Sequence, residues 1–158
     1  MTRNVDVPRE VVFAYLADVA NHAEFTDHFL TDFRLERLQT RGVGAAYRYR
    51  LKFRPARMWG EAVVTEATAP HRIVLDGQAG RVGRVKTKAA FTLTRTDHGL
   101  THVEYEFESF PQARVDRLKE ALGLRPWLRR NSAKALRRLA RTLEQGEPSM
   151  RAARVAAG

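Results

Sequence analysis

Hydrophobic and polar positions alternate with a period of two through the central part of the chain. The clearest case is "AYRYRLKF", residues 46–53, which would point Tyr47, Tyr49, Leu51 and Phe53 to one side and Arg48, Arg50 and Lys52 to the other. Residues 84–94 and 101–109 alternate in the same way, and residues 57–68 and 71–76 read as two further strands. Such alternation predicts an antiparallel sheet with one face in water.

Two charged rows predict which strands are neighbours. Lys86 and Lys88 lie on the polar side of one strand, and Glu104, Glu106 and Glu108 lie on the polar side of the next. Opposite charges on neighbouring strands stabilise a particular register. We therefore expect the two strands to pair.

Helical periodicity replaces the alternation at both ends of the chain. Residues 7–19 and 21–29 predict two short helices, and a longer helix is predicted from about residue 125 to residue 145. At 100° per residue, the long helix places Leu128, Ser132, Ala135, Leu136, Leu139 and Leu143 on one stripe, opposite its basic residues. Trp127 falls outside this stripe. Since a sheet with one apolar face must be covered, this helix is expected to cover it.

Length and composition indicate one folded unit. The chain has 158 residues, of which 44% are hydrophobic and 29% charged, as in globular domains. We expect a single domain over residues 1–145 and a disordered tail over residues 146–158. There is no cysteine. No apolar run approaches the roughly 18 residues that span a bilayer, and the start lacks a signal-peptide pattern, so a cytoplasmic location is expected.

The net charge of +10 belongs mainly to the C-terminal part. Residues 113–158 hold twelve lysines and arginines against four acids. The basic helix face is expected to be solvated, and a weak contact with an anionic membrane is a further hypothesis. Nucleic acid is disfavoured, because the outward Arg48, Arg50 and Lys52 have no aromatic stacking partner in the predicted pattern. The oligomeric state is left open.

Several segments together resemble a known superfamily. They are "VPREVVFAYLADVANHAEFTD", the strand "AYRYRLKF", the segment "EAVVTEATAPHRIVL" and the terminal amphipathic helix. Over about residues 2–145 the chain resembles the START-related superfamily, and within it the bacterial polyketide cyclase/dehydrase and lipid-transport branch. The resemblance implies an α+β helix-grip fold: a curved antiparallel sheet of about six or seven strands wraps a long C-terminal helix, and two short helices follow the first strand. It also implies an apolar cavity between sheet and helix, and no universal catalytic residue.

Most kinds of catalytic site are disfavoured. Ser109, Ser132 and Ser149 lie in no nucleophile-elbow context, and the glycines at 42–44 and 77–83 read as hairpin turns instead of nucleotide-binding loops. His22, Glu24, Asp27 and His28 are interpreted as a polar surface helix, because structural zinc prefers more His or Cys ligands at tighter spacing. No metal and no cofactor is expected.

General acid–base chemistry is the remaining enzymatic possibility. Glu61 and Tyr49 are the candidate catalytic residues, since a carboxylate facing an apolar cavity would have a raised pKa. Residues 57–68 are apolar on both faces, so Glu61 could equally lie in water, and tyrosines at such positions are more often core residues.

Two hypotheses about function follow. The first is binding or transport of a hydrophobic or amphipathic small molecule in the cavity; the second is an aromatase/cyclase-like enzyme acting on a polyketide. The expected ligand-binding residues are Tyr47, Tyr49, Phe53, Trp59, Phe91, Tyr105, Phe107, Leu128, Leu136 and Leu139.

Overall fold

One seven-stranded antiparallel sheet forms the body of the molecule. In the computed structural model, which describes residues 1–53, 58–80, 83–112 and 123–146, the sheet order is β1-β7-β6-β5-β4-β3-β2. The strands are β1 (Thr2–Val5), β2 (Leu30–Leu35), β3 (Ala46–Leu51), β4 (Met58–Thr68), β5 (Arg72–Ala79), β6 (Val85–Arg95) and β7 (Thr101–Pro111). Strands β2 to β7 lie in the sheet in chain order, each hydrogen-bonded to the next. Strand β1 pairs with β7 and forms one edge of the sheet, and β2 forms the other.

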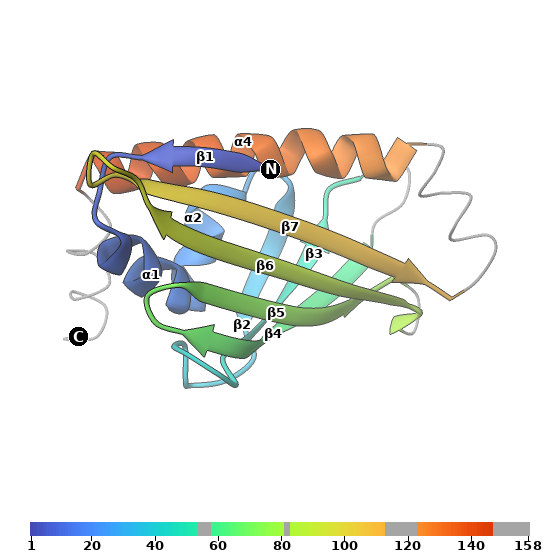
Figure 1. Cartoon of the computed structure of the whole chain (residues 1–158). Helices are drawn as coiled ribbons and strands as arrows, with labels where there is room; N and C mark the ends of the chain where they lie inside the picture. Colours follow the sequence, from blue (N-terminus) through green and yellow to red (C-terminus); the bar gives the residue numbers. More distant parts are fainter. Residues whose placement is uncertain (54–57, 81–82, 113–122, 147–158) are drawn as a thin grey trace.

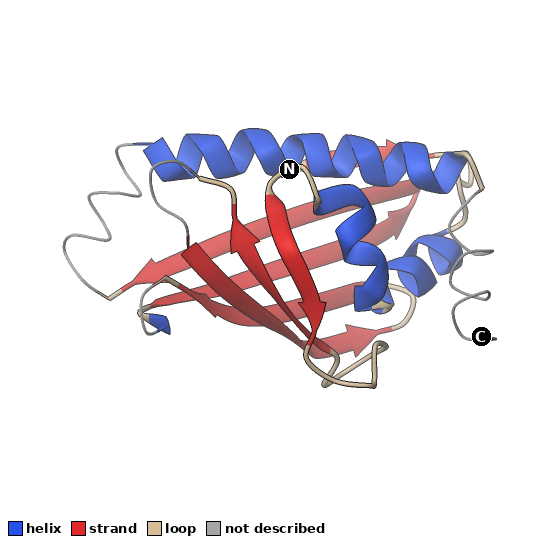
Figure 2. Ribbon diagram, turned by 180° about the vertical axis from the view of Figure 1, so that it is seen from behind, coloured by secondary structure: helices blue, strands red, loops and turns tan. Residues whose placement is uncertain are grey.

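Four helical segments accompany the sheet in the described parts of the chain. Between β1 and β2 lie α1 (Arg9–Ala17), the short 3-10 helix η1 (Val19–Asn21) and α2 (His22–Thr26). The long helix α4 (Arg125–Glu144) runs along the sheet with β1 beside it (Figure 1). The view from behind shows α1 and α2 at one end of the sheet (Figure 2). The α+β helix-grip prediction is therefore confirmed.

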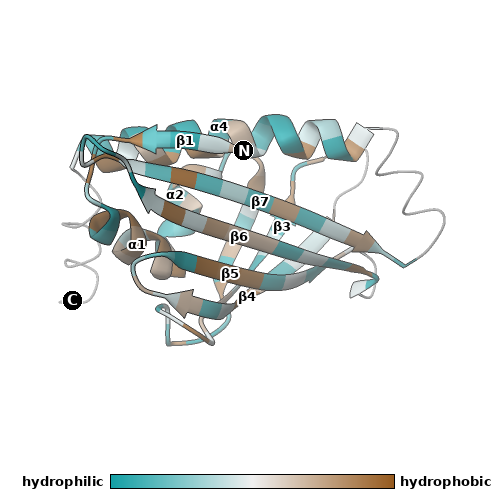
Figure 3. Ribbon diagram, viewed as in Figure 1, coloured by the Kyte–Doolittle hydropathy of each residue, from teal (hydrophilic) through white to brown (hydrophobic). Residues whose placement is uncertain are grey.

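The faces of the well-patterned strands are as predicted. Tyr47 and Tyr49 are buried and Arg48 is exposed in β3, and β6 and β7 show the same alternation as colour bands in Figure 3. The register places Lys88 opposite Glu108, whereas Lys86 faces Phe110. The predicted pairing of the two strands is confirmed, but only one of the two lysines faces a glutamate.

Helix α4 packs through the predicted stripe. Its buried residues are Ser132, Ala135, Leu136, Leu139, Ala140 and Leu143. All of them except Ser132 join one hydrophobic cluster with residues of α1, α2 and the sheet. Pro126 occupies the first turn of the helix, where its missing N–H leaves no hydrogen bond unmade. The cluster holds the helix against the sheet, and this packing defines the space described below.

Two parts of the sequence prediction are not tested. The helical pattern at residues 113–122 and the expected tail from residue 147 onward lie outside the described residues. The single domain over residues 1–145 stays a prediction.

Candidate ligand cavity

An internal cavity lies between the sheet and α4. Its volume is about 120 Å³, several times the roughly 10–15 Å³ that one water molecule requires. Seven of the residues expected to bind a ligand line it: Tyr47, Tyr49, Phe91, Tyr105, Phe107, Leu128 and Leu136. Further lining residues include Phe25, Phe29, Leu75, Ala89 and Ala135. The wall is therefore mainly apolar and aromatic, the composition typical of small-molecule pockets.

Three tyrosines place phenol groups in this apolar wall. Tyr47 and Tyr49 are neighbours on one face of β3, with ring centroids 5.9 Å apart, and Tyr105 of β7 lies 4.7 Å from Phe91. Burial raises the pKa of Tyr49 to about 12, and the negative charge of Glu61 adds to the shift. Burial likewise raises the pKa of Tyr47 and of Tyr105. All three hydroxyls therefore stay protonated near neutral pH and can donate hydrogen bonds to a carbonyl oxygen.

The ring of Tyr49 lies against the backbone of Gly60. The two residues are directly opposite one another in the β3–β4 register. A Cβ atom at residue 60 would come within 2.5 Å of Tyr49 Cζ, closer than real carbon atoms approach. Glycine is therefore needed at residue 60 for Tyr49 to take this position. The sequence shows a glycine inside a strand, which is a weak signal of close approach.

His22 also borders the cavity, and sequence reasoning missed it. The residue is 2% exposed, and its ring lies edge-on to Tyr47 and Phe91, at centroid distances of 5.5 and 6.2 Å. Nε2 donates to the Leu16 carbonyl oxygen at 2.8 Å. Burial lowers the pKa of His22 to about 4, although this hydrogen bond and Asp18 oppose the shift. The interpretation of this segment as a polar surface helix is wrong for His22, because α2 turns it toward the sheet.

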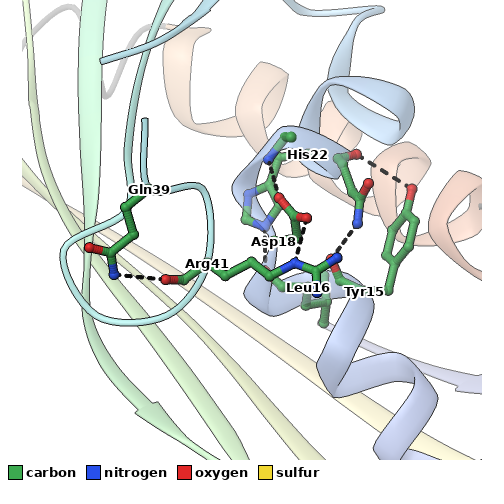
Figure 4. A network of polar contacts seen from close by, with 8 residues as sticks. Tyr15, Leu16, Asp18, His22, Gln39 and Arg41 are labelled. Carbon is green, nitrogen blue, oxygen red and sulfur yellow. Dashed lines mark hydrogen bonds and ion pairs between the residues drawn. The ribbon is translucent and has the colours of Figure 1, made fainter. Parts of the chain in front are cut away.

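A polar network fixes the turn that carries His22 (Figure 4). Asp18 is buried, accepts a hydrogen bond from Ala20 N at 3.2 Å and pairs with Arg41 Nε at 2.8 Å. The Asn21 side chain donates to the Tyr15 carbonyl oxygen at 3.0 Å. These contacts satisfy buried polar groups between α1 and α2, so the orientation of His22 is held by the surrounding structure.

The other polar residues of that segment join α2 to α4. Arg138 pairs with Asp27 at 2.6 Å and donates to the Glu24 carbonyl oxygen at 3.0 Å. His28 Nε2 lies 3.1 Å from the Asn131 carbonyl oxygen. Within the described parts of the chain, no group of three His, Asp or Glu residues is placed to hold a metal ion. The segment anchors the end of the cavity to the long helix.

Strand β4 turns two predicted site residues away from the cavity. Met58 and Ala62 line the cavity. Trp59 and Glu61, which alternate with them along β4, therefore lie on the outer face and border a separate groove. Trp59 is 42% exposed. Trp59 was expected to bind the ligand and does not line the cavity, and of the two faces left open for Glu61 the structure shows the outer one. The strand is apolar on both sides, so its face is decided by pairing with β3.

Three further hydrophobic residues lie near the cavity without lining it: Leu139, Phe53 and Trp127. Leu139 is completely buried in the core and does not border the cavity. Phe53 packs edge-on against Trp127 at 5.2 Å, and Trp127 also contacts Phe29 at 6.0 Å. Trp127 lies outside the apolar stripe of the helix, and its contacts with Phe29 and Phe53 account for its position. The three rings form an aromatic cluster beside the cavity.

The basic face of α4 is exposed. Arg129, Arg130, Lys134, Arg137 and Arg141 all face solvent. Across the described residues, no helix is long and apolar enough to cross a membrane. Contact of this face with an anionic membrane stays a prediction.

His22 is expected to make stability depend on pH. Its folded-state pKa of about 4 lies below the ordinary 6.5, so the unfolded chain takes up the proton first. Burial of neutral His22 therefore lowers the free energy of unfolding as the pH falls. This free energy has its full value above pH 6.5 and decreases by about 3 kcal/mol in total as the pH falls toward 4. In His22→Gln, whose amide can still donate to Leu16, urea unfolding between pH 7 and 4 should lack this loss. An unchanged pH dependence in this variant, with the exposed His98→Gln as control, would contradict the assignment.

A family model identifies the family of this chain, and solved structures share its fold. A family model described as polyketide cyclase / dehydrase and lipid transport matches residues 1–144. No curated protein matches the chain at a significant level. The protein TTHA0849 from Thermus thermophilus is 9% identical with a TM-score of 0.72, covering 93% of this chain and 97% of that one.

Two similar structures come from natural-product pathways. StfQ, a di-domain ARO/CYC of the steffimycin biosynthetic pathway, is 17% identical with a TM-score of 0.62; the match covers 93% of this chain and 44% of StfQ. DynU16, a putative protein of the dynemicin biosynthetic locus, is 21% identical with a TM-score of 0.59, covering 94% of this chain and 48% of that one. At these identities the similarity establishes the fold.

Proposed function

Because the chain belongs to the polyketide cyclase/dehydrase and lipid transport family, we propose that it binds a hydrophobic or amphipathic small molecule in the internal cavity. The observation that carries this proposal is the cavity itself, bounded by aromatic and aliphatic side chains of the sheet, α2 and α4. Burying apolar ligand surface there would supply affinity, at about 25 cal/mol per Å² of surface removed from water.

The polar groups of the cavity suggest which ligands it favours. Tyr47, Tyr49 and Tyr105 offer hydroxyl donors, while His22 is held neutral by burial. Ser132 is buried on the α4 side of the cavity and hydrogen-bonds Tyr105. Few polar groups on an apolar wall orient a ligand without requiring it to carry charge. An uncharged molecule with one or more carbonyl or hydroxyl groups on a hydrocarbon or polyketide skeleton fits these donors.

The second candidate function is cyclisation of a polyketide within the same cavity. The phenol groups favour it, since protonated hydroxyls can donate hydrogen bonds to a ketone oxygen and stabilise the negative charge that develops on it. Tyr49 remains a candidate catalytic residue for cyclisation. Glu61 is no longer a candidate, because its carboxylate lies on the other face of β4.

One experiment separates binding from cyclisation. The purified protein is extracted with organic solvent, and a second sample is first incubated with a synthetic poly-β-ketone; both extracts are analysed by mass spectrometry. Binding or transport predicts a co-purifying hydrophobic compound and an unchanged poly-β-ketone beyond its spontaneous reaction in buffer. Cyclisation with dehydration predicts a product lighter by one water. An empty extract together with no retention of the ketone would contradict both proposals.

A further inference from the structure

A row of polar side chains crosses the outer face of five strands, on the side opposite the cavity. The register pairs neighbouring members directly, in the order Arg34 (β2), Arg48 (β3), Glu61 (β4), Gln78 (β5) and Lys86 (β6). Directly opposed residues on adjacent strands share one face of the sheet. We call these five residues the outer row.

The two arginines at one end of the outer row form no ion pair among the described residues, although Glu61 lies opposite Arg48 in the register. Arg34 and Arg48 are both exposed and directly opposed, an arrangement that is unfavourable for like charges. In the described part of the chain, no carboxylate lies within ion-pair distance of either one, whereas the nearby Arg50 pairs with Asp32 at 2.7 Å. A bound anion would remove this repulsion and occupy the guanidinium donors.

An exposed indole lies beside these arginines. Trp59 is 42% exposed, and its ring centroid lies 5.2 Å from the guanidinium carbon of Arg48 and 5.7 Å from that of Arg50. The cation–π contact positions Arg48 without using its N–H donors on a carboxylate. The structure thus supplies the aromatic stacking partner that the sequence pattern lacked.

The groove next to Trp59 continues along the outer row. It is lined by Arg48, Trp59, Glu61 and Gln78, with backbone at glycines 60, 80 and 83. Gln78 Nε2 donates to Glu61 Oε1 and its Oε1 accepts from Lys86 Nζ, which fixes both side chains. Glu61 Oε2 has no hydrogen-bond partner among the described residues, so it is available to accept from a ligand N–H.

Gly83 makes room for this arrangement. Its φ is +64°, and a Cβ there would lie 2.6 Å from Gln78 Oε1. A larger residue would therefore push the amide out of its place in the groove. The position of the Gln78 amide in the groove therefore depends on a glycine at residue 83.

We propose that this outer site binds a nucleoside phosphate. The base stacks on the exposed part of the Trp59 indole, beside the Arg48 and Arg50 guanidiniums that lie over the ring. An amino group of the base donates to Glu61, and the phosphate binds Arg34 and Arg48. Arg34 and Glu61 are two strand spacings apart, about 9–10 Å, which suits a ligand with its anion at one end and its hydrogen-bonding edge at the other. A simple anion would use the arginines alone, and an uncharged aromatic ring would leave them unpaired.

The test titrates the full-length protein with AMP, adenosine and inorganic phosphate separately. The background variant is Trp127→Phe, so that Trp59 is the only tryptophan and its indole N–H signal reports binding by NMR. AMP is expected to shift this signal and to bind at least about tenfold more tightly than either adenosine or phosphate, because only AMP uses both halves of the site.

Matched variants locate the site. Arg34→Gln should weaken AMP binding about tenfold, whereas Lys52→Ala, which removes a charge directly after β3 and outside the outer row, should change it less than about threefold. Ala89→Phe, which adds a ring inside the cavity, should leave AMP binding unchanged.

Three results would overturn the proposal. AMP binding no tighter than phosphate would indicate non-specific anion binding only. Equal losses in Arg34→Gln and Lys52→Ala would indicate general electrostatic attraction. No shift of the Trp59 signal at millimolar AMP would exclude the site.

Discussion

Leu139→Ala is expected to lower the free energy of unfolding by about 3–4 kcal/mol. Leu139 lies in the middle of the buried stripe of α4, is 0% exposed and belongs to the main hydrophobic cluster. Removing its isobutyl group loses the transfer free energy of the side chain and leaves a void that a rigid sheet and helix cannot close. Urea unfolding followed by circular dichroism measures the change.

Leu128→Ala is the matched control for this prediction. Leu128 is on the same helix but borders the cavity and is only partly buried, so part of its surface already lacks protein neighbours. The control should cost about 1–2 kcal/mol, which is less than the loss expected for Leu139→Ala. Equal losses in the two variants would show that Leu139 is not enclosed as the structure describes.

Ala89→Phe is expected to weaken ligand binding in the cavity at least about a hundredfold. Ala89 lines the cavity and lies between Leu75 and Phe107 in the register of the sheet. The added ring can be accommodated only in the space proposed for the ligand, and it should cost about 1–3 kcal/mol or less of stability. Titration with the uncharged fluorophore N-phenyl-1-naphthylamine, which has no anion for the arginines of the outer site, measures the binding.

Lys88→Phe supplies the control on the same strand. Lys88 precedes Ala89 in β6 and points to solvent, so the same ring is added on the other face of the sheet. Fluorophore binding in this variant should match that of the unaltered protein. If a folded Ala89→Phe protein bound the fluorophore with unaltered affinity, the cavity would not be the binding site.

The outer site and the cavity use opposite faces of the same strands. Within β4, Met58 and Ala62 line the cavity, while Trp59 and Glu61 border the outer groove. The Tyr49 ring packs against Gly60, and the charge of Glu61 contributes to the raised pKa of Tyr49. The two proposals can nevertheless be tested separately, since Arg34 and Ala89 each belong to one site only.

The amino-acid pattern by itself determined the antiparallel sheet, the terminal helix that covers it and the faces of the regular elements, while the helix-grip arrangement was implied by the resemblance to a known superfamily. Strands β3, β6 and β7 alternate between apolar residues and charged ones, and a charged side chain cannot be buried without a partner. The inward positions of Tyr49, Phe91 and Tyr105 therefore followed from sequence. So did the buried stripe of α4, because its leucines and arginines lie on opposite sides of one helix.

Only the tertiary structure decided the faces of β4 and the position of His22. Residues 58–64 are apolar on both sides, so periodicity cannot distinguish them, and pairing of Gly60 with Tyr49 selects the face. Helix α2 has only five residues, too few to show a helical stripe, and its burial depends on the packing of α1 and α4 around it. A periodic pattern identifies the buried face of an element only where polar residues lie on one side and apolar residues on the other. Where both sides are alike, contacts with segments distant in sequence determine which side is buried.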